Sequence, residues 1–536
     1  MACLISSPNL VQGMLVEQPS HNQLFSHAWN LNKTSNHALF SKRCRLPGHR
    51  SSKSSRMVRS ALVERLQGSS SVEEEIESEF IRELKQDLQA EEDPRLLREI
   101  WREVQGLNDW EGLLDPMNSN LRQEILRYGE FAQSSYDSFD FDPHSKYCGS
   151  CKYGRAEFFE KMDMAHYGYH ICRYLYATSN INLEKFFRRS SSIRSIWSPH
   201  ANWMGYVAVT SDEEEIKRLG RRDILIVWRG TVTYLEWIHD LKNILRPAHF
   251  RDNPHVQIES GFYDLYTTKE ENCKFCSFSA REQVLAEVKR LVERFKGEKL
   301  SITVTGHSLG GALALLSAYD IAEMRLNIVR DEKKKTKKIP VTVYSFASPR
   351  VGNLKFKERC DELEVKQLRV VNVHDKVPTM PGLIANEKNK LQKYLEDTVH
   401  FPWSYAHVGT ELALDHAHSP FLKPTADLSC AHNLEAHLHL VDGYRGKGRK
   451  FSLANKRDIA LVNKDSDFLK SEYGVPPRWR QDHNKGMVRN SEGRWVVPDR
   501  ARVEHHPPDT AHHFALAMKV AHDPQFNVLR GQQHGV

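Results

Sequence analysis

The clearest pattern of hydrophobic and polar positions along the chain lies between residues 301 and 322. Residues 301–305 read Ser-Ile-Thr-Val-Thr, which alternate as in a strand, and an Ala- and Leu-rich run without Gly or Pro begins at residue 312. The glycine-flanked stretch around Ser308 separates the two. This order predicts a strand, a sharp turn and a helix, with Ser308 at the apex of the turn.

Four other runs of mostly apolar residues predict strands: 203–210, 223–228, 341–346 and 367–373. The run at 223–228 is almost unbroken, which is typical of a strand buried on both faces of a parallel sheet. Strands that alternate with helical patterns predict an α/β fold, with a mostly parallel central sheet flanked by helices. In such sheets the loops at the carboxyl ends of the strands form the site.

The chain before residue 150 predicts helices and one loop. Charged helix formers dominate residues 61–102, where apolar residues recur at helical spacing: Ile76, Phe80, Leu84 and Leu88. Residues 120–134 read as a second helix, and 108–116 as the loop before it. We therefore expect a helical N-terminal extension over residues 61–150, followed by a catalytic domain with a C-terminal extension over 151–536.

The formal net charge of +7 is confined to the start of the chain. Residues 1–60 hold eight Lys and Arg residues against one acidic residue, Glu17, so the remaining residues sum to zero. This distribution gives no basis for nucleic-acid binding. No run of eighteen apolar residues occurs in the sequence, so we predict no transmembrane segment.

Residues 1–60 are also rich in Ser and Asn. This composition is typical of a transit peptide, and the Ser content favours plastids over mitochondria. A plain disordered arm is the alternative, and either interpretation excludes the segment from the fold.

Ser308 is the candidate nucleophile, because a Ser on a strand-turn-helix projects its hydroxyl clear of the sheet. Such a Ser needs a base within hydrogen-bond reach and a carboxylate that orients the base. Asp375 follows the predicted strand 367–373 directly, so it should reach the same rim of the sheet. A simple turn residue is the alternative role for this Asp.

The base is harder to assign, because histidines are crowded downstream, among them His400, His407, His416, His418, His432, His437 and His439. We assign His432, which stands at a predicted junction between loop and helix from which a side chain can reach the rim. His437 and His439 lie further inside that helix, where packing or solvated roles are expected.

Several segments in this order resemble the class 3 lipase family: Arg229-Gly230-Thr231, 306–314, 345–353, 372–378 and 432–439. The similarity extends over about residues 101–500 and is strongest to plastid-targeted class I phospholipase A1 enzymes of the gamma type. These are related to the lipase that releases fatty acid for jasmonate synthesis. His437 departs from the pattern, because this plant family usually has Tyr there.

The resemblance implies a triad of Ser308, Asp375 and His432 that cleaves sn-1 acyl esters of polar glycerolipids, phosphatidylcholine or galactolipids. It also implies peripheral contact with a membrane surface and no metal or organic cofactor. Oxyanion stabilisation would come from the N–H groups of Leu309 and Thr231.

Residues 233–241 resemble a lid helix with an apolar face of Tyr234, Trp237, Ile238 and Leu241, although an ordinary helix packed on the core is an equal alternative.

Other functions stay open at this point. If the protein is an enzyme, the alternative function is that of a neutral acylglycerol lipase. If it is not an enzyme, the alternative is a catalytically silent lipase-fold protein that regulates signalling.

The cysteine pairs Cys148/Cys151 and Cys273/Cys276 could bind zinc or form disulfides, and we favour thiols without either role. The basic run 333–338 predicts a solvated loop.

The targeting prediction can be tested with two fusions. Residues 1–60 should carry a fluorescent reporter into plastids, and the chain that lacks these residues should remain in the cytosol when imaged in plant cells. Secretion or mitochondrial import of the first fusion would contradict the transit-peptide interpretation.

Overall fold

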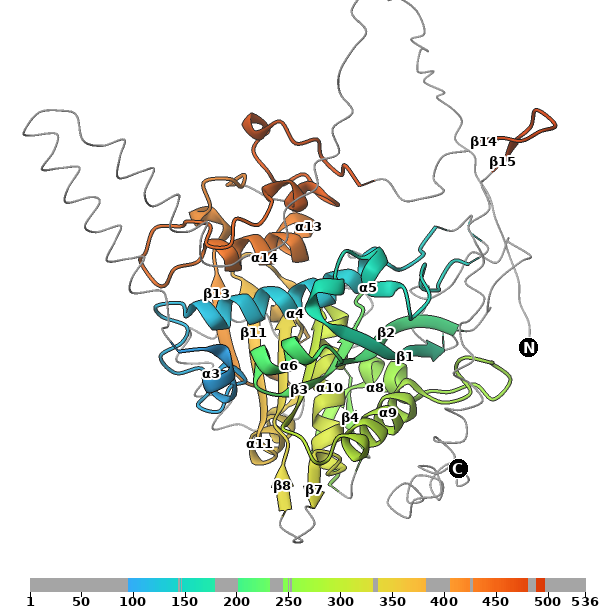
Figure 1. Ribbon diagram of the computed structural model, residues 1–536, viewed down its shortest axis with the longest axis vertical. Helices are drawn as coiled ribbons and strands as arrows, with labels where there is room; N and C mark the ends of the chain where they lie inside the picture. Colours follow the sequence, from blue (N-terminus) through green and yellow to red (C-terminus); the bar gives the residue numbers. More distant parts are fainter. Residues whose placement is uncertain are drawn as a thin grey trace, which may run out of the picture. The chain divides into compact units, whose positions relative to one another are not determined.

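A seven-stranded sheet organises the chain in the computed structural model (Figure 1). Its strand order is β1-β2-β3-β6-β9-β11-β13, and neighbours from β3 onward run parallel. Strand β2 runs antiparallel to both β1 and β3. The strands are β1 (Tyr169–Thr178), β2 (Ala201–Thr210), β3 (Arg222–Trp228), β6 (Leu300–His307), β9 (Val341–Phe346), β11 (Val365–Asn372) and β13 (Thr410–Leu414). The predicted α/β class with a mostly parallel sheet is confirmed, and the five predicted strands are among these seven.

The structure describes residues 95–142, 145, 147–178, 201–231, 244–248, 250, 253–330, 336–381, 405–424, 428–480 and 488–496. The predicted transit peptide, residues 61–94 of the predicted helical extension and His400 lie outside this range. The same is true of the four predicted lid residues Tyr234, Trp237, Ile238 and Leu241.

Helices cover both faces of the sheet because side chains alternate along its strands. In β3, Ile224 and Ile226 belong to one hydrophobic cluster, while Leu225 and Val227 belong to another. The first cluster also contains residues of α8 (Ser260–Thr267), α9 (Ala280–Arg294) and α10 (Leu309–Glu323). The second contains residues of α3 (Leu97–Val104), α4 (Ser119–Asp137) and α14 (Leu434–Gly443).

Smaller elements complete the described chain. The short helices are α5 (Phe158–Lys161), α6 (Glu213–Leu219), α11 (Leu354–Glu362) and α13 (Leu428–Ala431). A second sheet joins β12 (Tyr405–Ala406), β10 (Gly352–Asn353), β5 (Gln257–Glu259) and β4 (Leu245–Pro247). Two hairpins pair β7 (Ile328–Arg330) with β8 (Thr336–Lys338) and β14 (Val488–Arg489) with β15 (Trp495–Val496). The end of the basic run 333–338, predicted as loop, is thus an exposed strand.

Helix α4 is built into the core, and Figure 1 shows it crossing the strands. The Asn118 side chain caps the helix by accepting a hydrogen bond from the backbone N–H of Leu121 at 3.1 Å. Further along, a Cβ at Gly129 would clash with Leu438 of α14. Glycine here lets α4 approach α14 closely.

The predicted boundaries of the transit peptide at residue 60 and of the helical extension at residue 150 stay predictions.

A buried carboxylate joins α4 to the start of the sheet. Asp223 on β3 accepts hydrogen bonds from the hydroxyls of Tyr128 on α4 and Tyr169 on β1, at 3.0 and 2.8 Å. Its other oxygen accepts from Ser301 and Thr303 on β6, at 2.5 and 2.6 Å. Four donors on one buried carboxylate compensate the loss of its hydration.

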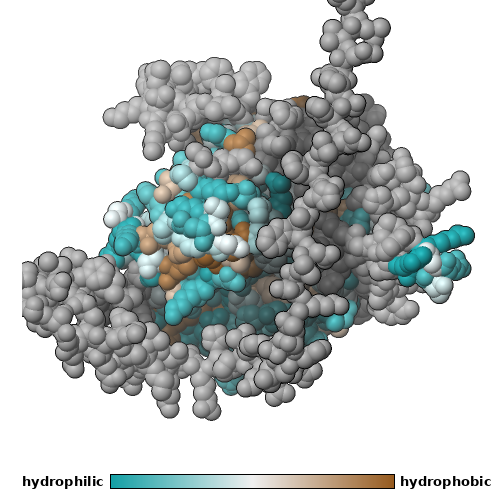
Figure 2. Space-filling view, turned by 90° about the horizontal axis from the view of Figure 1, so that it is seen from above, coloured by the Kyte–Doolittle hydropathy of each residue, from teal (hydrophilic) through white to brown (hydrophobic). Residues whose placement is uncertain are grey.

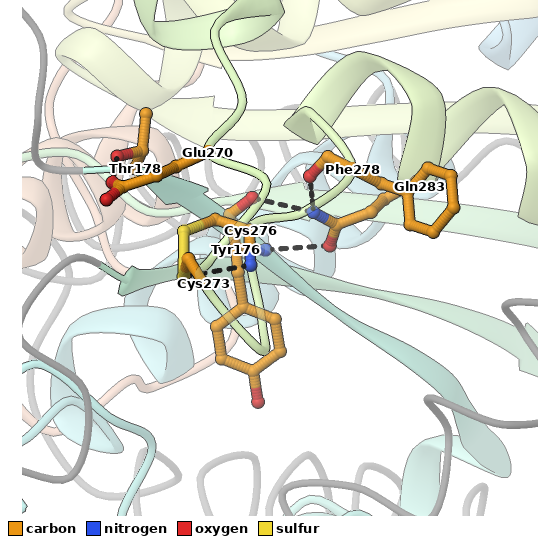
Figure 3. The surroundings of a disulfide bond; sticks show 7 residues. All are labelled: Tyr176, Thr178, Glu270, Cys273, Cys276, Phe278 and Gln283. Atoms are coloured by element: carbon orange, nitrogen blue, oxygen red, sulfur yellow. Dashed lines mark hydrogen bonds between the residues drawn. A yellow bond between two sulfur atoms is a disulfide. The ribbon is translucent and has the colours of Figure 1, made fainter.

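The cysteine pairs differ from each other. Cys273 and Cys276 form a disulfide in the loop between α8 and α9 (Figure 3), so the prediction of thiols is wrong for this pair. Cys148 and Cys151 form no disulfide. Beside the disulfide, the Gln283 side chain on α9 exchanges two hydrogen bonds with the backbone of Tyr176 on β1. This contact fixes the start of α9 against the edge strand β1.

Within the described residues, no helix is both long enough and apolar enough to cross a bilayer. Figure 2 shows hydrophilic and hydrophobic residues interspersed on the described part of the face that it presents.

Candidate active site

Ser308 stands at the apex of a sharp turn between β6 and α10, as the sequence predicts. Its backbone has φ 59° and ψ −128°, which is unfavourable for a residue with a side chain. Glycines on either side make the turn possible, because a Cβ at Gly306 would clash with the carbonyl of Gly310. The Ser308 N–H donates to the carbonyl of Phe346 on β9 at 2.9 Å, which anchors the turn to the next strand.

The Ser308 hydroxyl is buried, and it neither donates nor accepts a hydrogen bond among the residues that the structure describes. It lies beside the start of α10, where backbone N–H groups without helical partners and the helix dipole favour negative charge. When a hydroxyl in this position attacks a substrate carbonyl, the carbonyl oxygen becomes negative, and the start of α10 can stabilise that charge.

Asp375 and His432 come together from distant parts of the sequence. His432 Nδ1 lies 2.7 Å from Asp375 Oδ2, and both residues are almost fully buried. Asp375 follows the end of β11, and its other carboxylate oxygen accepts from the N–H of Val377 at 3.0 Å. His432 lies between α13 and α14, at the junction that the sequence predicts.

Burial sets the charge of this pair. It lowers the pKa of His432, because the imidazolium would lose its hydration, and the neutral ring is favoured. It raises the pKa of Asp375, an effect opposed by the nearby His437 ring and by backbone N–H donors. A neutral His432 that donates its Nδ1 proton to Asp375 keeps the lone pair on Nε2, as a general base requires.

His307 connects the turn at Ser308 to the loop of His432. Its Nε2 lies 2.7 Å from the backbone carbonyl of His432, and the two rings have centroids 4.5 Å apart. A carbonyl can only accept, so His307 Nε2 carries the proton. The residue preceding the candidate nucleophile therefore holds the backbone of the candidate base.

Tyr136 on α4 completes this connection. Its hydroxyl lies 2.8 Å from His307 Nδ1. Burial lowers the pKa of His307, and the His432 and His437 rings add to the effect, so the ring is neutral and Nδ1 accepts from Tyr136. The sequence analysis did not identify either residue. The position of His307 beside Ser308 was the available signal, whereas Tyr136 lies 171 residues before it in the chain.

Thr231 follows the end of β3 and lies close to the turn. The end of β3 contacts α10 so closely that a Cβ at Gly310 would clash with the backbone of Trp228 and Arg229. Thr231 and His307 share a pocket of about 220 Å³, whose other lining residues are Gln133, Tyr136, Phe141, Asn433, Leu434, Glu435, Asp465 and Arg480. The roles of Leu309 and Thr231 as donors stay predictions.

Three other downstream histidines that the structure describes form hydrogen bonds outside the Asp375–His432 pair. His437 Nδ1 donates to the Asn433 carbonyl at 2.8 Å, and its Nε2 accepts from the N–H of Asn372 at 3.3 Å. It thus ties α14 to the end of β11. His439 contacts the Ser419 hydroxyl at 2.8 Å, and His407 the Pro378 carbonyl at 2.8 Å. These contacts agree with the packing roles expected for His437 and His439.

Comparison with known proteins identifies the family of the chain. The family described as Lipase (class 3) matches residues 225–384, which include Ser308 and Asp375. Phospholipase A1-Igamma3, chloroplastic, of Arabidopsis thaliana is 67% identical over 440 residues, 80% of this chain and 83% of that protein. The chain belongs to the class 3 lipase family.

Two other Arabidopsis thaliana relatives extend the comparison. Phospholipase A1-Igamma2, chloroplastic, is 60% identical to this class 3 lipase over 79% of the chain and 80% of its own length. Galactolipase DONGLE, chloroplastic, is 46% identical over 65% of the chain and 70% of its own length. The resemblance identified from the sequence motifs is confirmed, and the chain is a lipid ester hydrolase.

The link from Tyr136 to His307 generates a prediction. Tyr136→Phe removes the hydroxyl and leaves a buried imidazole nitrogen without its donor, which costs about 1–3 kcal/mol. We expect kcat on a soluble short-chain ester to fall about tenfold, with little change in KM, because the loop of His432 loses its fixed position. Steady-state kinetics of the purified variant provides the measurement.

Tyr167→Phe is the matched control, because the Tyr167 hydroxyl also bonds a residue of α4, Glu130, but does not contact His307. This variant should lose thermal stability and keep kcat. Equal losses of kcat in both variants would show that Tyr136 acts only through the stability of the fold.

Proposed function

We propose that this protein hydrolyses the sn-1 acyl ester of polar glycerolipids and releases a free fatty acid and a lysolipid. The observation that carries the proposal is the buried Asp375–His432 hydrogen bond, together with His307, which bonds the His432 carbonyl and directly precedes a serine at the apex of a glycine-flanked turn. The names of the relatives, phospholipase A1 and galactolipase, supply the class of substrate. They give no support to a neutral acylglycerol lipase or to a catalytically silent regulatory protein.

In the proposed mechanism, Ser308 Oγ attacks the ester carbonyl carbon while His432 Nε2 takes the hydroxyl proton. The tetrahedral intermediate collapses when His432 returns this proton to the oxygen of the leaving lysolipid. A water molecule then attacks the acyl-enzyme, with His432 again as the base, and frees the fatty acid and Ser308.

Asp375 has two functions in this scheme. It holds His432 in the tautomer that presents Nε2, and its negative charge stabilises the imidazolium that forms in each step. The second function matters because burial disfavours the imidazolium in the resting protein. We assign the oxyanion to the N–H groups of Leu309 and Thr231, where loss of one donor costs about 2.7–4 kcal/mol of barrier.

The site of action follows from the relatives and from the N-terminal segment. The three relatives compared above are named chloroplastic, which supports a plastid location for this protein. We propose that it meets its substrate at a plastid membrane surface as a peripheral protein, with residues 233–241 as a lid.

The triad assignment predicts the kinetics of four variants. Ser308→Ala and His432→Ala should each lower kcat on the order of 10⁴-fold or more, and the double variant should be barely slower, because nucleophile and base act as a unit. Asp375→Asn should lose somewhat less, since the imidazole remains but is misoriented. Release of fatty acid from phosphatidylcholine and from a galactolipid gives the rates.

His439→Ala serves as the control, because His439 is a buried histidine of the adjacent helix that contacts Ser419 instead of Asp375. It should lose far less activity. If His432→Ala retained activity while His437→Ala or His416→Ala abolished it, the base would be assigned to the wrong histidine.

A further inference from the structure

Two histidines and an aspartate gather just after the ends of β11, the strand that precedes Asp375, and its neighbour β13. His374 follows β11, and Asp415 and His416 follow the neighbouring parallel strand β13. Each residue offers one ligand atom, and these atoms all lie within 4.8 Å of one another. None of the three belongs to the proposed catalytic machinery.

The separations suit a small metal ion. His374 Nε2 lies 2.9 Å from Asp415 Oδ1. Ligands about 2.0–2.2 Å from a tetrahedral zinc ion are about 3.3 Å apart, so modest side-chain rotations would bring the three atoms into range. His374 and Asp415 have side chains 48% and 30% exposed, which leaves access for water as a further ligand.

The surroundings prepare His416 as a ligand. This ring is buried, and its Nδ1 lies 3.2 Å from the amide nitrogen and 3.3 Å from the amide oxygen of Asn372. When the amide nitrogen donates to Nδ1, the proton of the neutral ring is on Nε2, and Nδ1 keeps the lone pair that a metal ligand needs. The same amide nitrogen also donates to the Ala431 carbonyl, so it would keep a partner if a metal displaced it from His416.

The aspartate is held in place as well. Asp415 Oδ1 accepts from the backbone N–H of Ala417 at 2.8 Å, which fixes the carboxylate beside His374. Two imidazoles and one carboxylate favour zinc or a similar transition-metal ion, whereas Ca²⁺ and Mg²⁺ require mostly oxygen ligands.

We propose that His374, Asp415 and His416 bind one Zn²⁺ ion. The ion would join the end of β13 to the turn after β11, next to Asp375, and would stabilise that turn. This proposal is independent of the proposed hydrolytic function, and its test does not use enzyme activity.

The test measures binding of Zn²⁺ to the full chain after removal of metals with a chelator. Equilibrium dialysis against buffered free zinc, with metal analysis by mass spectrometry, gives stoichiometry and Kd for the wild type, His374→Ala, Asp415→Asn and His418→Ala. Asn can keep the bond to Ala417, so Asp415→Asn changes the ligand more than the local backbone. His418, an exposed histidine close in sequence to His416, is the matched control.

We expect one zinc ion per chain that raises the melting temperature of the wild type and of His418→Ala. In His374→Ala and Asp415→Asn, Kd should rise about tenfold or more and the shift in melting temperature should disappear, with unchanged circular dichroism. An unchanged Kd in the two ligand variants, or an equal loss in His418→Ala, would overturn the assignment. Displacement of zinc by equimolar Ca²⁺ would overturn the choice of metal.

Discussion

The active-site turn depends on backbone segments that meet without side chains between them. Gly306 and Gly310 contact each other across the turn, and Gly310 also contacts the end of β3. A Cβ at either position would push α10 away from the sheet. The strained backbone of Ser308, the start of α10 and the loop of Thr231 are therefore positioned by the same contact, which neighbouring parallel strands make possible.

A chain of hydrogen bonds extends this constraint to the rest of the site. Tyr136 on α4 holds His307, and His307 holds the backbone of His432. On the other side, His437 ties α14 to the end of β11, from which Asp375 extends. Helix α4, which precedes the sheet in sequence, thus helps to position the site, because it covers the face of the sheet on which His307 lies.

The sequence predicted the parts of the fold that local pattern controls. The strand, turn and helix around Ser308 follow from alternation and from the two glycines, and Asp375 follows from its place after an apolar strand. His432 was the best of several histidines because it precedes a helix. Strand β1 was not predicted, since its polar and aromatic residues do not alternate, and β13 is too short to give a clear pattern.

Contacts between distant residues could not be predicted in the same way. Nothing local to Tyr136 indicates that its hydroxyl meets His307, and the disulfide of Cys273 and Cys276 depends on how the loop between α8 and α9 packs. The grouping of His374 with Asp415 and His416 likewise results from the register of β11 and β13. These features require the arrangement of the strands in space.

Labelling with a serine-reactive phosphonate tests the central claim, that Ser308 is a nucleophile activated by His432, most directly. Peptide mass spectrometry of the labelled protein should find one phosphonate, on the peptide that contains Ser308. The rate of labelling should fall at least about a hundredfold in His432→Ala, because the hydroxyl loses its base, and should change little in His439→Ala. Label on another residue, or an unchanged rate in His432→Ala, would contradict the account.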